Sequence, residues 1–121
     1  MSDIATPGAN ALLDGTALGA TLYVQLHTGD PGTNGTANVA TESARKAFTR
    51  TAAAGGVATN VASIEWPSAA ATETATHVSI WSAASGGTCW FVDDITDEAI
   101  DTGDLIVIAA GDLSLAFTVW T

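Results

Sequence analysis

The sequence contains very few basic residues. Only three of its 121 residues are Lys or Arg, against 13 Asp or Glu, and the formal net charge at pH 7 is −10. A nucleic-acid-binding protein needs a basic surface to displace counterions from phosphates, and an anionic membrane surface would repel so acidic a chain. We therefore expect neither nucleic acid nor a membrane as a partner. The three basic residues, Arg45, Lys46 and Arg50, form one local cluster.

Cysteine and long apolar runs are also scarce. With Cys89 as its one cysteine, the chain cannot form an intrachain disulfide. No apolar run approaches the roughly 20 residues that a membrane-spanning helix needs. The first residues show neither a basic segment nor an apolar one, so we expect no signal peptide. At 121 residues the chain has the length of one domain and can bury a core without covalent or metal cross-links.

Charged residues of either sign make up 13% of the chain, which is about half of the usual share. Ala, Thr, Ser and Gly take their place. A surface of such small side chains loses little conformational entropy when another subunit covers it. The composition therefore indicates contacts between protein subunits, or else only a coding bias toward Ala and Thr, and both interpretations stay open.

The clearest pattern in the sequence is alternation of apolar and polar residues. It is strongest over residues 21–27. One face of this segment consists of Leu22, Val24 and Leu26, and the other consists of Tyr23, Gln25 and His27. Period-two alternation predicts a half-buried strand. The same pattern or a short apolar run, bounded by turn residues, predicts further strands over residues 44–51, 57–66, 76–81, 88–92, 105–109 and 113–120.

These segments predict an all-β fold, an antiparallel β-sandwich of about seven or eight short strands, of the jelly-roll or Ig-like kind. The last two segments flank the turn Ala110-Gly111-Asp112 and predict a hairpin. Residues 93–104 are acidic and predict a solvated connection before a strand. Residues 1–8 predict an extended arm, and residues 9–121 a single domain that begins with a short helix, capped by Asn10 and closed by Gly15.

The stretch Leu26-His-Thr-Gly-Asp-Pro-Gly-Thr-Asn-Gly35 resembles a functional loop because it combines His, Asp and three Gly. A phosphate-binding loop needs GxxxxGK[ST] before a helix, but this stretch has no Lys, and Asp30 would repel phosphate. Pro31 and Gly32 instead suit a turn in which Gly32 takes a positive φ. We predict a rigid turn that directs a long loop toward a neighbouring subunit.

Other candidate chemistry is weak. A zinc site needs three or four ligands in ordered spacing, and His27 and His77 show none. The acids of residues 93–104 do not match the EF-hand spacing, although a nonstandard calcium loop stays an alternative. Cys89 lies in an apolar strand pattern, where a thiol behaves as a small hydrophobic group. We therefore expect no catalytic, cofactor or metal site, and no enzymatic activity.

The chain contains four tryptophans. In the alternation of their predicted strands, Trp81 and Trp120 occupy outward-facing positions, which predicts that both are exposed. His27 likewise falls on the polar face of its strand and is expected at the surface or in an interface. Exposed tryptophans serve as anchors in protein interfaces or as platforms on which sugars stack. The composition favours interfaces here.

Four blocks of the sequence resemble a family of small tailed-phage virion proteins, known variously as phage tail fibre, minor tail or capsid decoration proteins. The resemblance covers about residues 9–116, and Ser43 and Ser82 replace the Tyr and Asp usual in the family. The matching blocks are Leu26 to Gly32, Ala44-Arg45, Ile80-Trp81 with Gly86-Gly87, and Gly103-Asp104 with Ala110-Gly111.

The resemblance implies a non-enzymatic structural protein of the virion. Because the sequence shows no fibre shaft or receptor-binding module, we expect a capsid decoration (cement) protein that bridges capsomers on the outside of the head after assembly in the bacterial cytoplasm. Its expected partners are the major capsid protein and two further copies in a homotrimer. The alternatives are a minor tail or tail-fibre-base protein, and a carbohydrate-binding module that adheres to a host-surface glycan.

Within this interpretation, the N-terminal arm binds neighbours by strand addition and the basic cluster pairs with acidic groups. The residues expected at interfaces are Asp3, Ile4, Thr6, Pro7, His27, Asp30, Arg45, Lys46, Arg50, Trp81 and Trp120.

Overall fold

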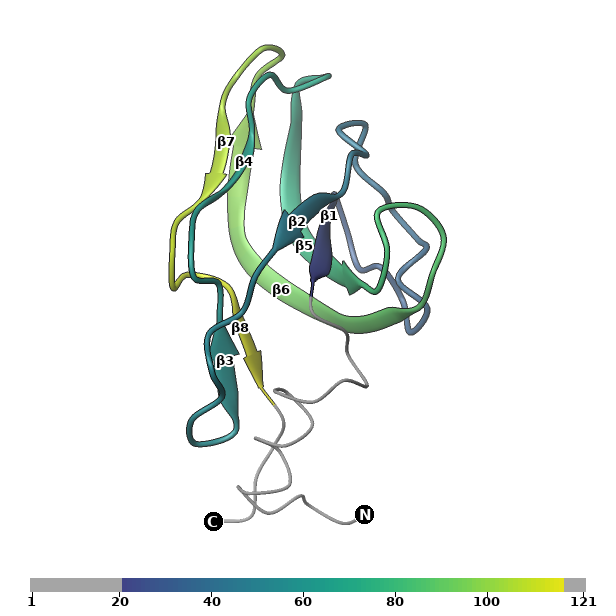
Figure 1. Ribbon diagram of the computed structural model, residues 1–121. Coiled ribbons are helices and arrows are strands. Elements are labelled where there is room, and N and C mark those ends of the chain that lie inside the picture. Colours follow the sequence, from purple (N-terminus) through teal and green to yellow (C-terminus); the bar gives the residue numbers. More distant parts are fainter. Residues whose placement is uncertain (1–20, 117–121) are drawn as a thin grey trace.

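The computed structural model describes residues 21–116, and within them every regular element is a strand (Figure 1). All strand pairs are antiparallel, so the all-β prediction is confirmed. No helix in this range is long and apolar enough to span a membrane. The strands are β1 Leu22–His27, β2 Lys46–Phe48, β3 Val57–Thr59, β4 Ile64–Trp66, β5 Glu73–Trp81, β6 Cys89–Ile100, β7 Ile106–Ile108 and β8 Ser114–Ala116.

Several predictions concern residues outside the described range. The arm over residues 1–8, with Asp3, Ile4, Thr6 and Pro7, is one of them, and so are the short helix after Asn10 and the exposure of Trp120.

The described strands form a four-stranded sheet in the order β2-β1-β5-β6 and two separate pairs, β3-β8 and β4-β7. This pairing does not confirm a jelly-roll or Ig-like sandwich.

The core lies on one face of the four-stranded sheet. Leu22 and Val24 of β1 and Val78 and Ile80 of β5 have no exposed surface, as their alternation predicts. Val24 lies opposite Ile80, and Leu26 lies opposite Val78, so these side chains form cross-strand pairs. Trp66 of β4 is fully buried as well, and its indole Nε1 donates to the carbonyl of Ala44 at 2.8 Å. The indole nitrogen therefore keeps a hydrogen-bond partner inside the core.

The opposite face of β1 is buried too, which its polar residues did not predict. Gln25 is 8% exposed and His27 has no exposed surface. The chain between β1 and β2 folds back over this face: Gln25 Nε2 donates to the carbonyl of Ser43 at 3.1 Å, and Ala40 N donates to the carbonyl of Leu26 at 3.0 Å. The polar side chains on this face therefore bind a loop of their own chain.

The hairpin predicted from the segments 105–109 and 113–120 is wrong. β7 pairs with β4, and β8 pairs with β3. The two pairs lie end to end and form one ribbon with a corner, where residues 60–63 face residues 109–113 (Figure 1). A turn signal such as Ala110-Gly111-Asp112 indicates that the chain changes direction. It does not indicate which strands the flanking segments pair with, because that depends on segments distant in the sequence.

Asn60 holds this corner together. It is 2% exposed, and its amide Nδ2 donates to the carbonyls of Ala62 and Ala109, both at 2.9 Å. Its Oδ1 accepts from Leu113 N at 3.0 Å, while its own carbonyl accepts from Gly111 N at 2.9 Å. The side chain therefore supplies the bonds that the ribbon loses where its ladder is interrupted.

We expect Asn60→Ala to lower the free energy of unfolding by about 2 kcal/mol, because buried donors and acceptors lose their partners. Urea unfolding monitored by tryptophan fluorescence measures the loss. Asn34→Ala, at an exposed position in the loop after β1, is the matched control and should be near neutral. Equal losses in the two variants would contradict the role assigned to Asn60.

The acidic segment continues the strand β6 to Ile100, so the prediction of a connection over the whole segment is wrong, although most of its acids are exposed as predicted. Exposure along β6 alternates: Phe91, Asp93 and Ile95 are half-buried, whereas Val92 and Asp94 are exposed. The acids are therefore spread along an extended backbone. The apolar residues between them already carry the strand pattern, which the high density of charge obscures.

Candidate functional site

Trp81, the last residue of β5, lies at the centre of a cluster that joins several loops. Its side chain is 7% exposed, and the guanidinium carbon of Arg45 lies 3.9 Å from the centroid of its ring. That is a cation–π contact. Arg45 Nη1 also donates to the carbonyls of Ala83 at 2.9 Å and Gly86 at 2.7 Å. Arg45 therefore fixes the turn between β5 and β6 over the indole.

A chain of hydrogen bonds runs from the other side of Trp81 to the loop after β1. Trp81 Nε1 donates to Ser79 Oγ at 2.6 Å, and Ser79 Oγ lies 2.7 Å from His27 Nε2. His27 Nδ1 lies 2.8 Å from the carbonyl of Ala37. Because a carbonyl only accepts, Nδ1 carries a proton. Burial lowers the pKa of His27 below its usual value and favours the neutral imidazole, in which Nε2 accepts from the serine hydroxyl.

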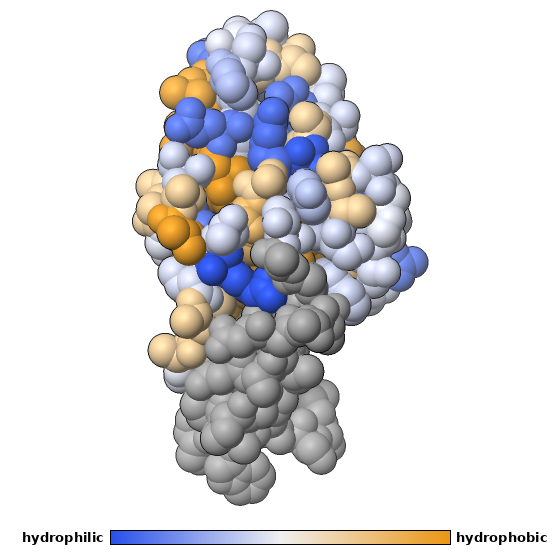
Figure 2. Space-filling model, viewed as in Figure 1, coloured by the Kyte–Doolittle hydropathy of each residue, from blue (hydrophilic) through white to orange (hydrophobic). Residues whose placement is uncertain are grey.

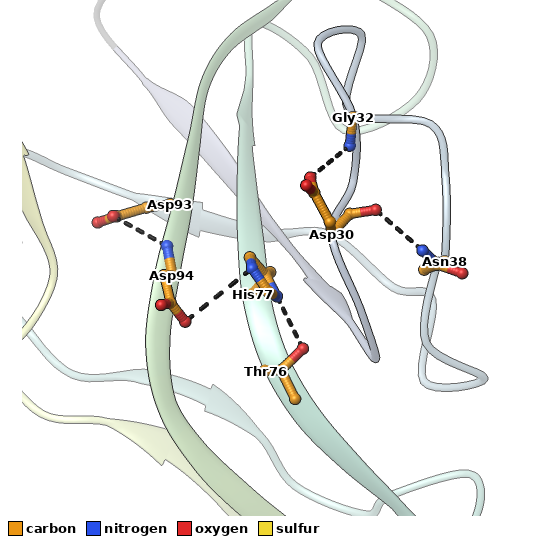
Figure 3. A network of polar contacts seen from close by, with 7 residues as sticks. All are labelled: Asp30, Gly32, Asn38, Thr76, His77, Asp93 and Asp94. Carbon is orange, nitrogen blue, oxygen red and sulfur yellow. Dashed lines mark hydrogen bonds and ion pairs between the residues drawn. The ribbon is translucent and has the colours of Figure 1, made fainter.

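The loop after β1 closes on itself. Asp30 Oδ1 accepts from Gly32 N, and the carbonyl of Asp30 accepts from Asn38 Nδ2, both at 2.9 Å (Figure 3). Thr28 N donates to the carbonyl of Asn38 at 2.9 Å. Gly32 has a φ of 75°, so the positive φ predicted for it is confirmed. The two ends of the loop are therefore hydrogen-bonded to each other, as the predicted rigid turn requires.

Gly35 of the same loop packs on the Trp81 cluster. A Cβ placed on Gly35 would lie 2.5 Å from Cys89 Sγ and 3.2 Å from Trp81 Cζ2, so only glycine fits. Gly35, Arg45 and the segment from Trp81 to Gly86 come from three separate parts of the sequence, and all meet here. Three of the four blocks that carry the family resemblance therefore supply, or directly flank, parts of one packed cluster.

The comparison with protein families decides what kind of protein this is. The model of a family described as podophage GP4 fiber I protein gp80 matches residues 4–116. The chain belongs to this phage fibre protein family. It is accordingly a structural protein of the phage virion, in a family whose name points to a fibre rather than to the head. A search of curated proteins found no match.

The cluster of this fibre-family chain corrects two predictions from the sequence. His27 and Trp81, both expected at the surface, are buried, because strand parity tells which face a residue lies on but not which loop covers that face. Trp90, which the sequence did not single out, is 39% exposed. It lies at a bulge, since Ile80 pairs with Phe91 but Trp81 pairs with Cys89. A bulge leaves no clear signal in the alternation.

The remaining interface candidates lie at the surface in different degrees. Asp30 is exposed, and Arg45, Lys46 and Arg50 are half-buried. The guanidinium of Arg45 already binds two carbonyls and an indole of its own chain. Contact of these four residues with another subunit stays a prediction.

Ser79 and His27 have the contact of a nucleophile with its general base, but the arrangement does not suit catalysis. Neither residue has exposed surface, so no substrate atom reaches the hydroxyl. Nδ1 of His27 faces a backbone carbonyl rather than a carboxylate, and the hydroxyl already accepts from Trp81. A catalytic dyad needs an accessible nucleophile, so this pair is a structural connection between β1 and β5.

The other titratable residues near β6 have structural contacts. His77 Nδ1 lies 2.7 Å from Thr76 Oγ1, and its Nε2 lies 4.0 Å from Asp94 Oδ1 (Figure 3). Burial raises the pKa of the Cys89 thiol, which donates to the carbonyl of Phe91 at 3.4 Å. Over residues 21–116, no three His, Cys, Asp or Glu side chains are grouped so as to hold a metal ion. The acids of β6 are strung along a strand and do not form the nonstandard calcium loop.

Neutral His27 predicts a pH dependence of stability. Because the pKa of His27 is lowered in the folded state, its contribution is complete above the unfolded pKa of about 6.5 and is lost as the pH falls toward the folded value. The free energy of unfolding should fall by up to about 1.4 kcal/mol per pH unit in this window. Urea unfolding of the native chain and of His27→Gln between pH 7.5 and 5 measures it.

In this comparison the carboxylates titrate in both proteins and cancel in the difference. The stability advantage of the native chain over His27→Gln should therefore shrink as the pH falls. Parallel curves for the two proteins would contradict the neutral imidazole assigned to His27.

Proposed function

We propose that this chain is a non-enzymatic structural subunit of a podophage tail fibre, in which it joins other fibre subunits through preorganised loops. The observation that carries this proposal is the family match over residues 4–116, since the family description names a fibre. The expectation of a capsid decoration protein finds no support in that description. The tail-fibre alternative from the sequence therefore becomes the preferred function.

The geometry supports a joining role. The loop after β1 and the β5–β6 turn project on the same side of the sheet (Figure 1), and Arg45, Trp81 and His27 fix both of them. A rigid loop loses little entropy when a partner binds it. In the view of Figure 2, apolar residues lie in small groups among polar ones, which suits contact with protein subunits.

A glycan-binding role has lost Trp81, one of the two tryptophans on which it rested, and the other, Trp120, lies outside the described residues. Trp81 was expected to present its ring to a sugar, but the ring is 7% exposed and Arg45 covers one face of it. Stacking on a sugar needs an open aromatic face. We therefore do not propose carbohydrate binding from Trp81.

Particle imaging tests the proposed function. Phage particles carrying an epitope tag on this chain are labelled with an antibody and imaged by electron microscopy, and the copy number is measured by mass spectrometry against the major capsid protein. We expect label on the tail fibres and far fewer copies than of the major capsid protein. Label over the whole head, with copy numbers comparable to the capsid protein, would overturn the proposal in favour of a decoration protein.

A separate experiment on the purified chain tests the expected homotrimer. Light scattering of the purified chain gives its mass in solution, and a trimer would have three times the mass of 12.1 kDa calculated for one chain. The mass of a monomer would contradict the homotrimer.

A further inference from the structure

A pocket lies between β6 and β7, which run next to each other in Figure 1. It has a volume of about 250 Å³. Four of the residues that line it are at most 6% exposed, whereas Val107 is 47% exposed; the four are Leu26, Ala75, Ile106 and Leu113. The pocket therefore reaches from the surface into the hydrophobic core.

The strand β6 is irregular where it borders this pocket. Between its pairs with Ala75 and His77 of β5, β6 has three residues, 95–97, where β5 has one. Consecutive residues of a regular strand point to opposite faces, yet Ile95 and Thr96 both line the pocket. A bulge changes the direction of side chains in this way, and bulges are common beside functional sites. The bulge of β6 therefore turns an extra side chain toward the pocket.

The size of the pocket suits one side chain rather than a small-molecule ligand. Pockets for drug-sized ligands measure roughly 300–1,000 Å³, and this one is smaller, at about 250 Å³. Ile95, Ile108 and the four buried residues give it apolar walls. At protein interfaces, pockets of this kind receive a large apolar anchor side chain, which supplies much of the binding energy.

Two carboxylates lie at the mouth of the pocket. Glu98 of β6 and Asp112, at the corner of the ribbon, both line the pocket and both are exposed. Within residues 21–116 neither carboxylate has a hydrogen-bond or ion-pair partner. An anchor side chain with Lys or Arg beside it would therefore find opposite charge at the rim of its own pocket.

The basic residue has to come from a different protein. Lys and Arg occur in this chain only at positions 45, 46 and 50, so residues 1–20 and 117–121 contain neither. In a second copy, the guanidinium of Arg45 already binds two carbonyls and an indole of its own chain. The net charge of −10 on each copy would add repulsion.

We propose that this pocket binds one large apolar side chain of a different virion protein, flanked in that protein by Lys or Arg residues that pair with Glu98 and Asp112. None of the residues that line the pocket belongs to the Trp81 cluster, so this surface is separate from the loops that the cluster fixes. The inference does not depend on the fibre location, because it rests on the pocket and its rim.

Photo-crosslinking in intact particles tests the identity of the occupant. A photoreactive amino acid replaces Thr96, which lines the pocket, or Ala52, which is exposed between β2 and β3 and does not line it. We expect Thr96 to crosslink to a segment of another virion protein in which a large apolar residue lies beside Lys or Arg. A crosslink to a second copy, to residues 1–20 or 117–121 of this chain, or to a segment without a basic residue would overturn the proposal, as would no crosslink above the Ala52 control.

The crosslinked segment, made as a synthetic peptide, tests the pocket in solution by isothermal titration calorimetry with the purified chain. Thr96→Trp places a large side chain at the pocket and should weaken binding at least about tenfold, as should replacing the apolar residue of the peptide by Ala. Glu98→Lys should weaken binding about fivefold, the scale of an exposed charge pair. The matched control is Asp97→Lys, which makes the same change in net charge at an exposed neighbour that does not line the pocket.

Equal losses in Glu98→Lys and Asp97→Lys would show attraction by net charge alone and would overturn the pairing at the rim. Unchanged binding to Thr96→Trp would overturn the pocket as the site. Urea unfolding of each variant shows that it is folded, so a loss of binding is not a loss of structure. Particle imaging decides the fibre location separately, so the failure of one proposal is distinguishable from the failure of the other.

Discussion

Trp81→Ala should lower the free energy of unfolding by about 3–5 kcal/mol, the range for removing a large buried aromatic side chain. The indole has Arg45 stacked on its ring and Ser79 bonded to its nitrogen, and Gly35 packs beside it. Its removal therefore opens a cavity and also frees Arg45 from its stacking contact. Chemical denaturation monitored by circular dichroism measures the loss.

The matched control is Trp90→Ala, because this tryptophan is 39% exposed at the bulge of β6. We expect a loss below about 1 kcal/mol, as for most surface substitutions. Trp81→Phe keeps an aromatic face for Arg45 but loses the donor to Ser79, and it should cost an intermediate amount. Similar losses for Trp81→Ala and Trp90→Ala would show that Trp81 is not the centre of the cluster.

Gly35→Ala is expected to cost about 2–5 kcal/mol, from two effects. Its φ of 71° lies in the left-handed region, which costs a residue with a Cβ about 1–2 kcal/mol. The new Cβ would also lie 2.5 Å from Cys89 Sγ and 3.2 Å from Trp81 Cζ2, and such overpacking typically costs a further 1–3 kcal/mol or so. Thermal unfolding by calorimetry measures the sum.

Gly32→Ala separates the two effects. Gly32 has a similar φ of 75°, but a Cβ there meets no atom within 4 Å, so we expect only the conformational cost of about 1–2 kcal/mol. Cys89→Ala in the Gly35→Ala background removes the sulfur and should restore part of the loss. If both glycine variants lose the same stability, the contact between Gly35 and the cluster is not important.

The part of the fold that the sequence predicts well is the buried face of the sheet. Leu22, Val24, Val78 and Ile80 alternate with polar neighbours, and alternation follows directly from the geometry of a strand. The positive φ of Gly32 is predictable for the same reason, because it depends on the residue and its immediate neighbours. These features are local, and local chemistry is what a single sequence records.

The candidate site was not predictable in this way. His27 and Trp81 alternate with the apolar residues of their strands, so the sequence places both on the polar face. In the structure the loop after β1 and Arg45 cover that face, and both side chains are buried. The sequence placed Arg45 in a basic cluster with Lys46 and gave no sign that it stacks on the indole at the end of β5. Contacts of this kind join segments distant in the chain, so their residues show no periodic signal.

The bent ribbon also has a consequence for the order in which the protein folds. Val57 pairs with Ala116 and Trp66 pairs with Ile106, so the chain must close long loops before either end of the ribbon gains a hydrogen bond. Loop closure costs entropy, and contacts of high sequence separation form slowly. The ribbon should therefore form after the β5–β6 hairpin, in which Trp81 pairs with Cys89 across a short turn, and Asn60→Ala should accelerate unfolding more than it slows folding.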